Sequence, residues 1–375
     1  MGAGSSARSL AAFLLNVTAP APSHGTGLLP HCMATRSIDT SPTALREILN
    51  MSETELTIEP SNKYMFKHKG AYFVQDITTA EYIDSLEDFE IRDSDVFVAT
   101  FPKSGTVWVQ NILSLIYHEG HRDGTENIDL MDRVPWLEYN LRNVDYVNRP
   151  SPRLFATHLL HNLVPSDLRN RTGKVIYVAR NPKDVVVSYF HFSNFIVKLE
   201  TISDFNVFLE KFLAGKVSPG SWLDHIEGWF THRDDFNILF LTFEEMKKDL
   251  RGAVLKICKF LGKQLTEKEL DTVVENASFD NMKRDVRANY ENIPETSLQE
   301  QGKGYFLRKG TIGDWKNTMT VAQSERFDSV FKGKIQELPF KFIWDINEDL
   351  ECGFQLETGD SAHRGMKTHL CHGCS

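Results

Sequence analysis

Residues 95–117 of the chain read DVFVATFPKSGTVWVQNILSLIY, and this stretch decides the fold. The β-branched and aromatic run at 95–99 predicts a buried strand, and apolar residues at helical spacing over 108–117 predict a helix. Between them lies a loop, 100–107, that contains glycine and hydroxyl residues. A strand that turns through such a loop into a helix presents free N–H groups and the positive end of a helix dipole. The stretch therefore predicts an anion-binding loop, typically for phosphate, with Lys103 adding a full charge.

The position of Lys103 distinguishes this loop from the one that binds nucleoside triphosphates. That loop reads Gly-x-x-x-x-Gly-Lys-Ser/Thr, with the lysine directly after the second glycine. Here the lysine comes before Gly105. The loop therefore favours a phosphate-bearing donor other than ATP, and a small-molecule kinase of the P-loop type is the less favoured alternative.

The composition is that of a globular protein without an excess of positive charge. The chain has 375 residues, of which 41% are hydrophobic and 25% charged, so it can bury a large core. A net charge of −9 and the lack of a long basic run argue against a nucleic-acid partner. Five cysteines, an odd number, show no disulfide framework and favour a reducing, cytoplasmic compartment.

The two ends of the chain differ in composition from the middle. Residues 1–54 are predicted to be a disordered extension, or the product of a start upstream of a more natural one near Met51. The start at Met1-Gly2 also fits a myristoylation pattern, and the acid-poor composition weakly resembles a transit or signal peptide. An apolar run in this extension is too short to span a membrane. Residues 351–375 are predicted to be a tail whose His and Cys residues hold no metal, which leaves 55–350 as the working domain.

Strand and helix patterns alternate along this domain. Residues 173–180 predict a second strand, which is followed by a helix-start signal at Asn181-Pro182. Residues 237–243 predict a third strand, and residues 244–261 predict an amphipathic helix. Strands separated by helices imply an α/β fold, a single domain with a central parallel sheet flanked by helices.

Lys103, Arg180 and Phe243 lie at or just beyond the carboxyl ends of the three predicted strands. Ligands of open parallel sheets bind at this edge, so one pocket is expected to gather all three residues. Arg180 offers a fork of donors that suits phosphate oxygens. Ser188 follows two helical turns later and would reach the same edge only if its helix begins late.

A second candidate for anion binding lies far along the chain, in a predicted loop at 306–317. Arg308-Lys309-Gly310 places two cations next to a free backbone N–H group. Taken alone, such a tripeptide is also compatible with a solvated turn. Two anion-binding segments in one chain suggest a ligand that carries phosphates at both ends.

Together, two motifs resemble those of the cytosolic sulfotransferases. They are the loop PKSGT at 102–106 and the segment RKGTIGDWKN at 308–317. The resemblance runs from residue 69 to residue 347, which is nearly the whole domain. Details such as YFHF at 189–192 and FIWD at 342–345 are most similar to the amine sulfotransferase branch.

The resemblance implies 3′-phosphoadenosine 5′-phosphosulfate (PAPS) as the cosubstrate. The first loop would hold the 5′-phosphosulfate, while Arg180, Ser188 and residues 308–310 would hold the 3′-phosphate. The rings of Trp108 and Phe279 would enclose the adenine. The donor-binding residues implied are Lys103, Ser104, Gly105, Thr106, Val107, Trp108, Arg180, Ser188, Phe243, Ala277, Ser278, Phe279, Met282, Arg308, Lys309 and Gly310.

Three positions depart from the usual family pattern. Ala277 stands where Thr is usual, and Phe243 replaces the commoner Tyr, so one polar contact at each position is in doubt. Ala156 stands where many phenol-sulfating relatives carry Lys. These departures give slight support to the alternative that the chain binds the nucleotide, or its partner, without turnover.

His158 matches the family's catalytic histidine, and the resemblance implies that it acts as the base. Histidine suits this role because its pKa lies near the operating pH. Lys103 would stabilise charge on the bridging oxygen as the S–O bond breaks, and Ser188 is carried over as a third catalytic residue. The scheme needs no metal ion, and the predicted strands lack a terminal Asp to hold one.

The acceptor pocket is expected to be apolar and aromatic, and the missing cation at Ala156 favours an amine acceptor over a phenol. Residues 316–325 resemble the family's dimerisation motif, so a homodimer is expected through Lys316, Thr320, Val321 and Glu325. The acceptor-binding residues implied by position are Tyr72, Trp136, Tyr139, His158, Phe192, Tyr290 and Phe306.

Overall fold

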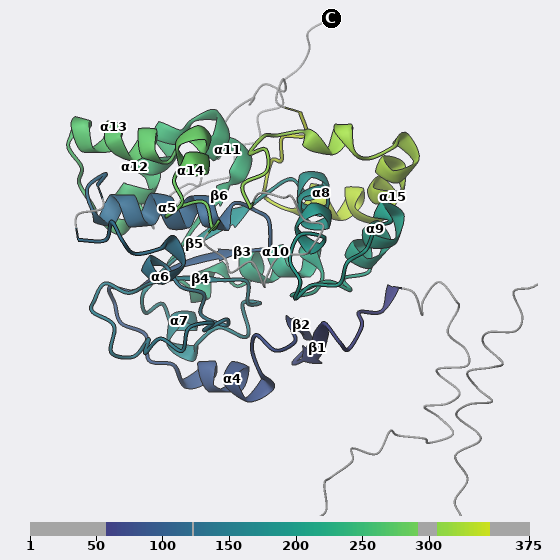
Figure 1. Cartoon of the computed structure of the whole chain (residues 1–375), viewed down its shortest axis with the longest axis horizontal. Helices are drawn as coiled ribbons and strands as arrows, with labels where there is room; N and C mark the ends of the chain where they lie inside the picture. The colour runs from purple at the N-terminus through teal and green to yellow at the C-terminus, as the bar shows by residue number, and fades with distance from the viewer. Residues whose placement is uncertain (1–57, 122–123, 292–305, 346–375) are drawn as a thin grey trace, which may run out of the picture. The chain divides into compact units, whose positions relative to one another are not determined.

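A four-stranded parallel sheet forms the centre of the computed structural model (Figure 1). Its strand order is β4 (Leu154–Thr157), β3 (Val96–Thr100), β5 (Lys174–Ala179) and β6 (Ile238–Thr242). The structure describes residues 58–121, 124–291 and 306–345. The predicted α/β architecture, a single domain with a parallel sheet flanked by helices, is confirmed.

The strands β3, β5 and β6 fall where the sequence predicted them, whereas β4 was not predicted. In β4 only four residues separate a proline-containing turn from His158, which is too short a run to show a pattern. The strand pairs along its whole length with β3, from Val96 opposite Leu154 to Ala99 opposite Thr157. This pairing places His158 beside the end of β3, where the anion-binding loop begins.

Side chains of each central strand point alternately into two hydrophobic cores. On β3, Val96 and Val98 belong to one core, and Phe97 and Ala99 belong to the other. All four are at most 1% exposed. The sheet is therefore covered on both faces, as a parallel sheet requires.

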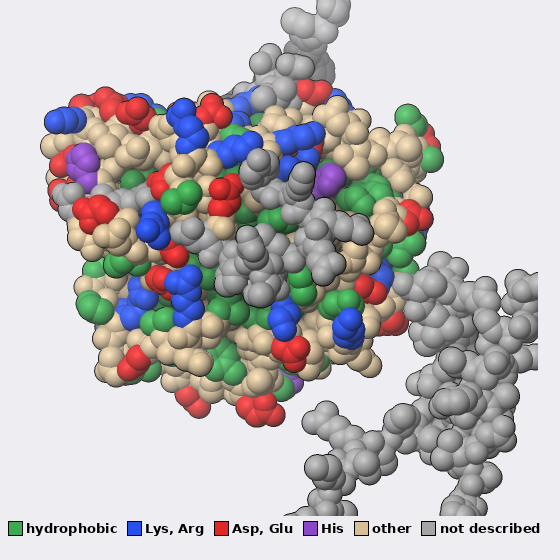
Figure 2. All heavy atoms as spheres, viewed as in Figure 1, with side chains coloured by type: hydrophobic (Ala, Val, Ile, Leu, Met, Phe, Trp, Pro, Cys, Tyr) green, Lys and Arg blue, Asp and Glu red, His purple; other side chains and the backbone are tan. Residues whose placement is uncertain are grey.

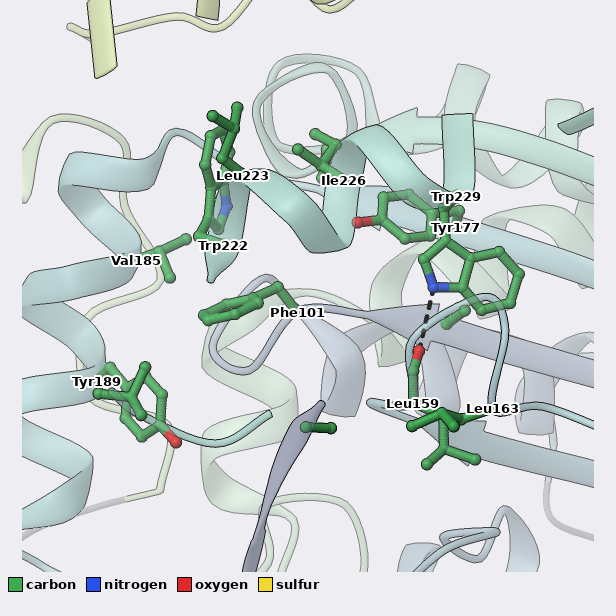
Figure 3. Packing of buried hydrophobic residues seen from close by; sticks show 14 of the residues in the cluster. Phe101, Leu159, Leu163, Tyr177, Val185, Tyr189, Trp222, Leu223, Ile226 and Trp229 are labelled. Carbon is green, nitrogen blue, oxygen red and sulfur yellow. Dashed lines mark hydrogen bonds between the residues drawn. The ribbon is translucent and has the colours of Figure 1, made fainter. Parts of the chain in front are cut away.

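Different helices cover the two faces (Figure 1). The core that contains Val96 is built with α5 (Thr106–Tyr117), α12 (Leu250–Leu261) and α13 (Glu267–Asn276). The core that contains Phe97 is built with α8 (Pro182–Ser193), α9 (Phe205–Leu213), α10 (Trp222–Thr231) and α15 (Val321–Glu337). Figure 3 shows the second core, where Trp222, Ile226 and Trp229 of α10 lie near Tyr177 and Phe101.

The helix predicted over 244–261 is two helices, so that prediction was wrong. The chain forms α11 (Phe243–Lys248) and then α12, with Asp249 between them. The Asp249 side chain accepts the N–H of Gly252 at 2.8 Å and so caps the start of α12. Aspartate favours such caps over helix interiors, because its carboxylate satisfies a free N–H group.

The remaining elements are short and lie around this framework. An antiparallel hairpin is formed by β1 (Met65–His68) and β2 (Ala71–Val74). No helix in the described part of the chain is both long and apolar enough to cross a membrane. The predicted extension 1–54 and tail 351–375 lie outside the described residues. The other short elements are α4 (Ala80–Ser85), η1 (Leu86–Asp88), α6 (Leu130–Arg133), α7 (Ser166–Arg169), η2 (Arg233–Asp235), α14 (Phe279–Arg284) and η4 (Asp314–Asn317).

Charged side chains of both signs are interspersed over the face shown in Figure 2. This mixture agrees with the net charge of −9. Any site for an anion must therefore concentrate positive charge locally.

Candidate functional site

One cavity of about 170 Å³ lies at the carboxyl ends of β3, β5 and β6. It brings together residues from both predicted anion-binding segments, which are some 200 residues apart in sequence, and His158. The residues predicted to bind the donor that line it are Lys103, Gly105, Thr106, Val107, Trp108, Arg180, Ser188, Phe243, Phe279, Met282, Arg308, Lys309 and Gly310.

The loop from β3 to α5 forms one wall of this cavity. Gly105 caps the first turn of α5 with a φ of 106°, a left-handed conformation that glycine adopts without strain. A Cβ atom there would stand 3.0 Å from the Phe243 ring. The Thr106 hydroxyl is tied to that of Thr100 at 2.7 Å. Because the loop is held at both ends, the N-terminus of α5 and its N–H groups are directed at the cavity.

Lys103 supplies a half-buried amine in this loop. Its Nζ lies 4.0 Å from the centre of the Phe192 ring and 4.7 Å from that of Phe306. Burial, together with repulsion from Arg180 and Arg308, lowers the Lys103 pKa to about 7. A bound anion would counter both effects, so the cavity is electrostatically suited to a ligand with several negative charges.

Arg180 connects the two anion-binding segments. Its guanidinium donates to the carbonyl of Lys103 at 3.0 Å and to that of Thr311 at 3.1 Å. It also lies 4.2 Å from the Phe243 ring centre. Within the described residues its Nε has no hydrogen-bond partner, although it is buried. Arg180 itself lines the cavity, so its guanidinium places positive charge there.

Two aspartates, Asp314 and Asp184, hold the loop that contains Arg308 and Lys309. Asp314 accepts from Arg308 and from Lys309, each at 2.6 Å. Although burial opposes ionisation, these hydrogen bonds and that of Asn317 lower the Asp314 pKa to about 2. Asp184 accepts the N–H of Gly313 at 2.8 Å. The two cations are thus presented by a loop whose backbone is anchored to α8.

Gly310 allows this loop to approach the opposite wall. Its φ is +60°, and a Cβ atom there would lie 2.2 Å from Cδ2 of Phe279. Phe279 is itself a predicted ring of the adenine site. The close approach explains why glycine is required at this position.

We expect Gly310→Ala to weaken nucleotide binding by about tenfold or more, because the new methyl group must displace Phe279 and strain the loop. Isothermal titration calorimetry with PAP, the desulfated nucleotide, measures this loss. Gly333→Ala is a matched control, since a Cβ atom on that α15 glycine meets no atom within 4 Å. Equal affinities for Gly310→Ala and the wild type would show that the loop does not contact the nucleotide.

Trp108 stands on α5 and lines the cavity. Its Nε1 donates to the Ala277 carbonyl at 2.7 Å, and its ring lies 5.3 Å from the Phe243 ring. Although Ala277 lacks the hydroxyl of the usual Thr, its backbone carbonyl therefore still contacts Trp108. Of the predicted donor residues, Ser104, Ala277 and Ser278 are not among those that line the cavity. The Ser104 hydroxyl is buried, and no described residue bonds to it.

His158 directly follows β4 and lines the same cavity. Its Nδ1 is 2.7 Å from the backbone oxygen of Thr100. A carbonyl oxygen can only accept, so Nδ1 carries the proton and Nε2 has a free lone pair. Burial lowers the His158 pKa to about 4. At neutral pH the ring is therefore uncharged and able to accept a proton.

Four of the seven predicted acceptor-binding residues line the cavity: Trp136, His158, Phe192 and Phe306. The Trp136 ring lies 4.5 Å from the His158 ring, and Phe192 contacts Phe306 edge-on. These aromatic rings form the apolar end of the cavity, next to Lys103.

The other three predicted acceptor residues do not line it. Tyr72 lies on β2, where its hydroxyl accepts from Lys216 at 3.3 Å. Tyr139 packs 6.5 Å from the Trp136 ring, and Tyr290 donates to Gln110 at 3.0 Å behind the Phe306 ring. Their positions in the family motif gave the prediction, but here these three residues are not among those that line the cavity.

Sequence reasoning missed five residues of the cavity wall. Lys247 had a recognisable signal, because it follows Phe243 by four residues and so shares its face of α11. Asp314 was part of the motif, but its pairing with two cations depends on the folded loop. The missed residues are Pro102, Lys247, Leu307, Thr311 and Asp314.

The fold and the site together are those of an α/β enzyme in which two cationic loops and a neutral histidine line one cavity at the carboxyl edge of the sheet. The chain belongs to the sulfotransferase family, because residues 93–339 match the model of the sulfotransferase domain. This confirms the family predicted from the two motifs.

Curated relatives agree with this assignment. The chain is 55% identical to the amine sulfotransferase of Oryctolagus cuniculus over 293 residues, which cover 78% of this chain and 97% of that protein. It is 41% identical to sulfotransferase 2B1 of Rattus norvegicus over 305 residues, 81% of this chain and 89% of that protein.

Solved structures show the same fold. A mouse sulfotransferase complexed with PAP superposes with a TM-score of 0.59 at 30% identity, covering 73% of this chain and 96% of that one. A retinol dehydratase in complex with androsterone and the inactive cofactor PAP gives a TM-score of 0.63 at 25% identity, with 73% and 89% coverage.

Proposed function

We propose that this sulfotransferase moves the sulfonate group of PAPS to the amine group of small, largely apolar acceptors, and that hydroxyl acceptors are a secondary class. The observation that carries the proposal is that one cavity is lined by Lys103, His158 and the Arg308-Lys309-Gly310 loop. Two relatives of similar fold were solved with PAP, which supports PAPS as the cosubstrate here.

In this proposal the donor lies across the cavity. The N-terminus of α5 and Lys103 hold the 5′-phosphosulfate. Arg180, Ser188 and the loop 308–310 hold the 3′-phosphate, since they line the same wall. The adenine lies between Trp108 and Phe279, whose flat rings are suited to stacking. The nucleotide serves as a cosubstrate, and the scheme uses no metal.

Transfer is proposed to occur by in-line attack on sulfur. The acceptor nitrogen forms a bond to sulfur as the bond between sulfur and the bridging oxygen breaks. Nε2 of His158 accepts the proton that the nitrogen loses. Lys103 stabilises the charge that builds on the bridging oxygen, and PAP leaves. Both groups face one cavity, as this geometry needs.

The preference for amines rests on the acceptor end of the cavity. The curated relative that is 55% identical carries the name amine sulfotransferase. Ala156 is fully buried on β4 and adds no cation where phenol-sulfating relatives carry Lys. An amine must be uncharged to attack, so the free lone pair on His158 is well matched to this acceptor.

The partner and location proposed are those of the family. We propose a homodimer through Lys316, Thr320, Val321 and Glu325, supported by the Val321 side chain, which is 75% exposed at the start of α15. We also propose a cytoplasmic protein whose working domain spans 55–350, with an extension at 1–54 and a tail at 351–375.

A transfer assay tests the proposal. Purified protein is incubated with [³⁵S]PAPS and a panel of amines, phenols and hydroxysteroids. We expect labelled product with amines. Transfer to phenols or steroids alone would contradict the amine assignment. Binding of PAP without transfer to any acceptor would contradict the enzymatic proposal and favour a nucleotide-binding protein without turnover.

A further inference from the structure

Glu138 is a buried acidic residue that the proposed mechanism does not use. Its side chain is 1% exposed, and burial raises its pKa to about 7. Oε1 accepts the backbone N–H of His158 at 2.7 Å. Its other oxygen, Oε2, has no hydrogen-bond partner among the described residues. Burying a carboxyl group in this way costs stability, so its contact with His158 calls for a functional explanation.

A short pairing beside β4 explains why Glu138 reaches His158. Trp136 and Ala156 form a parallel bridge, in which the Ala156 N–H donates to Pro135 at 2.8 Å and the Leu137 N–H donates to Ala156 at 2.9 Å. Two residues further along each segment, Glu138 therefore lies next to His158. This single bridged pair lies beside β4, and the hydrogen bond between Glu138 and His158 follows directly after it.

The opposite side of His158 is held by α10. Nε2 of His225 is 3.2 Å from the backbone oxygen of His158. Since that oxygen only accepts, Nε2 carries the proton, and Nδ1 accepts from the Tyr177 hydroxyl at 2.9 Å. His225 and Tyr177 are each 1% exposed.

The same helix holds the next residue in the same way. Nε1 of Trp229 donates to the backbone oxygen of Leu159 at 3.1 Å, the bond that is drawn in Figure 3. His225 and Trp229 are one helical turn apart, so two ring N–H groups on one face of α10 bind two consecutive carbonyls. The chain around His158 is thus fixed to α10 through side chains.

We propose that Glu138 and His225 are positioning residues that hold the backbone of His158, so that its Nε2 stays aimed at the acceptor. The inference rests on the proposed function, in which His158 is the base. Three hydrogen bonds then fix the position of His158: its N–H with Glu138, its C=O with His225, and its Nδ1–H with Thr100. Neither Glu138 nor His225 lines the cavity, so in this proposal they act on the reaction through His158 rather than by contact with a substrate.

The expected effect follows from the geometry of proton transfer. A displacement of about 1 Å in a catalytic group can lower a rate by about 10²-fold. Loss of one anchor should therefore lower kcat. Donor binding should not change, because the nucleotide is held by other loops. A residue with only a structural role would instead reduce stability and nucleotide binding together.

The test compares Glu138→Met with Glu138→Gln in the full chain. Methionine fills the space without an acceptor, whereas glutamine keeps an oxygen for the His158 N–H. We expect Glu138→Met to lower kcat by about 10- to 100-fold, with Kd for PAP within about twofold of the wild type. Its Tm should stay close to that of the wild type, because removal of a buried carboxyl offsets the loss of the acceptor for the His158 N–H. Glu138→Gln should retain most of the wild-type kcat.

Three results would overturn the inference. One is a wild-type kcat in Glu138→Met. Another is a parallel fall of kcat, PAP affinity and Tm, which would indicate a structural role. The third is an equal loss of kcat in Glu138→Gln, which would show that the acceptor oxygen is not what matters. His225→Leu and His225→Gln form the equivalent pair on the other side, because a glutamine amide can still donate to the His158 carbonyl.

A readout without activity separates this inference from the proposed function. In protein labelled with ¹⁵N-histidine, the His158 signal, identified by its loss in His158→Ala, should report a ring protonated only at Nδ1. Glu138→Met should show a mixture of tautomers, and Glu138→Gln should show the wild-type form. If the wild type transferred no sulfonate, this pattern would still support positioning, and its absence would overturn it.

Discussion

Replacing His158 with alanine is expected to lower kcat for sulfonate transfer by about 10²- to 10⁴-fold, the range that general bases contribute. PAP should bind with nearly unchanged affinity, because the residues proposed to hold the nucleotide do not include His158. Radiolabel transfer and calorimetric titration with PAP measure the two quantities. The expected loss is large because the ring is the neutral imidazole of the cavity wall, with Nε2 free to accept a proton.

The pH dependence of the wild type provides a second check on His158. Burial lowers its pKa to about 4, so the ring stays neutral until the pH falls well below 6. Activity that is limited by this group should persist at pH 5.5 and be lost only as the pH approaches 4.

His161→Ala is the matched control for His158→Ala. Burial also lowers the His161 pKa to about 4, but this ring stacks on His232 outside the cavity. We expect it to keep the wild-type kcat. Equal losses in both variants would indicate general damage, and an active His158→Ala would show that another group removes the proton.

Lys103→Met is expected to lower kcat by about 10²- to 10³-fold, similar to the loss of one donor from an oxyanion site. Methionine keeps the unbranched chain that the left-handed backbone at this position tolerates, with φ at 68°. It also keeps the apolar contact with Phe192 and Phe306. The lost ammonium would act mainly in the transition state, so the donor KM should rise by less than about tenfold.

Lys247→Met provides the comparison for Lys103→Met, because Lys247 is a cation of the same cavity on α11. We expect it to raise the donor KM and to change kcat far less. Steady-state kinetics with varied PAPS separates the two effects. If Lys103→Met raised only KM and left kcat intact, the lysine would contribute to ground-state binding rather than to the chemistry.

The architecture could be predicted from the sequence because its pattern is local. The strands β3, β5 and β6 each read as an apolar run that ends at a functional residue. The strand β4 could not be predicted, since its four residues depend on pairing with β3 for their conformation. The division between α11 and α12 was missed because the apolar spacing continues across Asp249, and only the capping bond shows the break.

The candidate site likewise contains residues that a local sequence motif indicates and residues that only folding brings together. Loop residues such as Lys103 and Gly310 were found because their motifs are contiguous in sequence. The acceptor end was predicted less well, because whether a tyrosine faces the cavity depends on packing between distant segments. Tyr290 illustrates this, since its hydroxyl is drawn toward Gln110 on α5. The support of His158 by His225 has no sequence signal, because the two residues are 67 positions apart.

The lowered pKa of Lys103 has a consequence for the protons exchanged when the nucleotide binds. With a pKa of about 7 before the nucleotide binds, much of this lysine is uncharged at pH 8. An anion bound beside it raises that pKa, so the complex should take a proton from the buffer. PAP affinity should therefore decrease as the pH rises above 7. The calorimetric heat at pH 8 should depend on the ionisation enthalpy of the buffer, and Lys103→Met should remove that dependence.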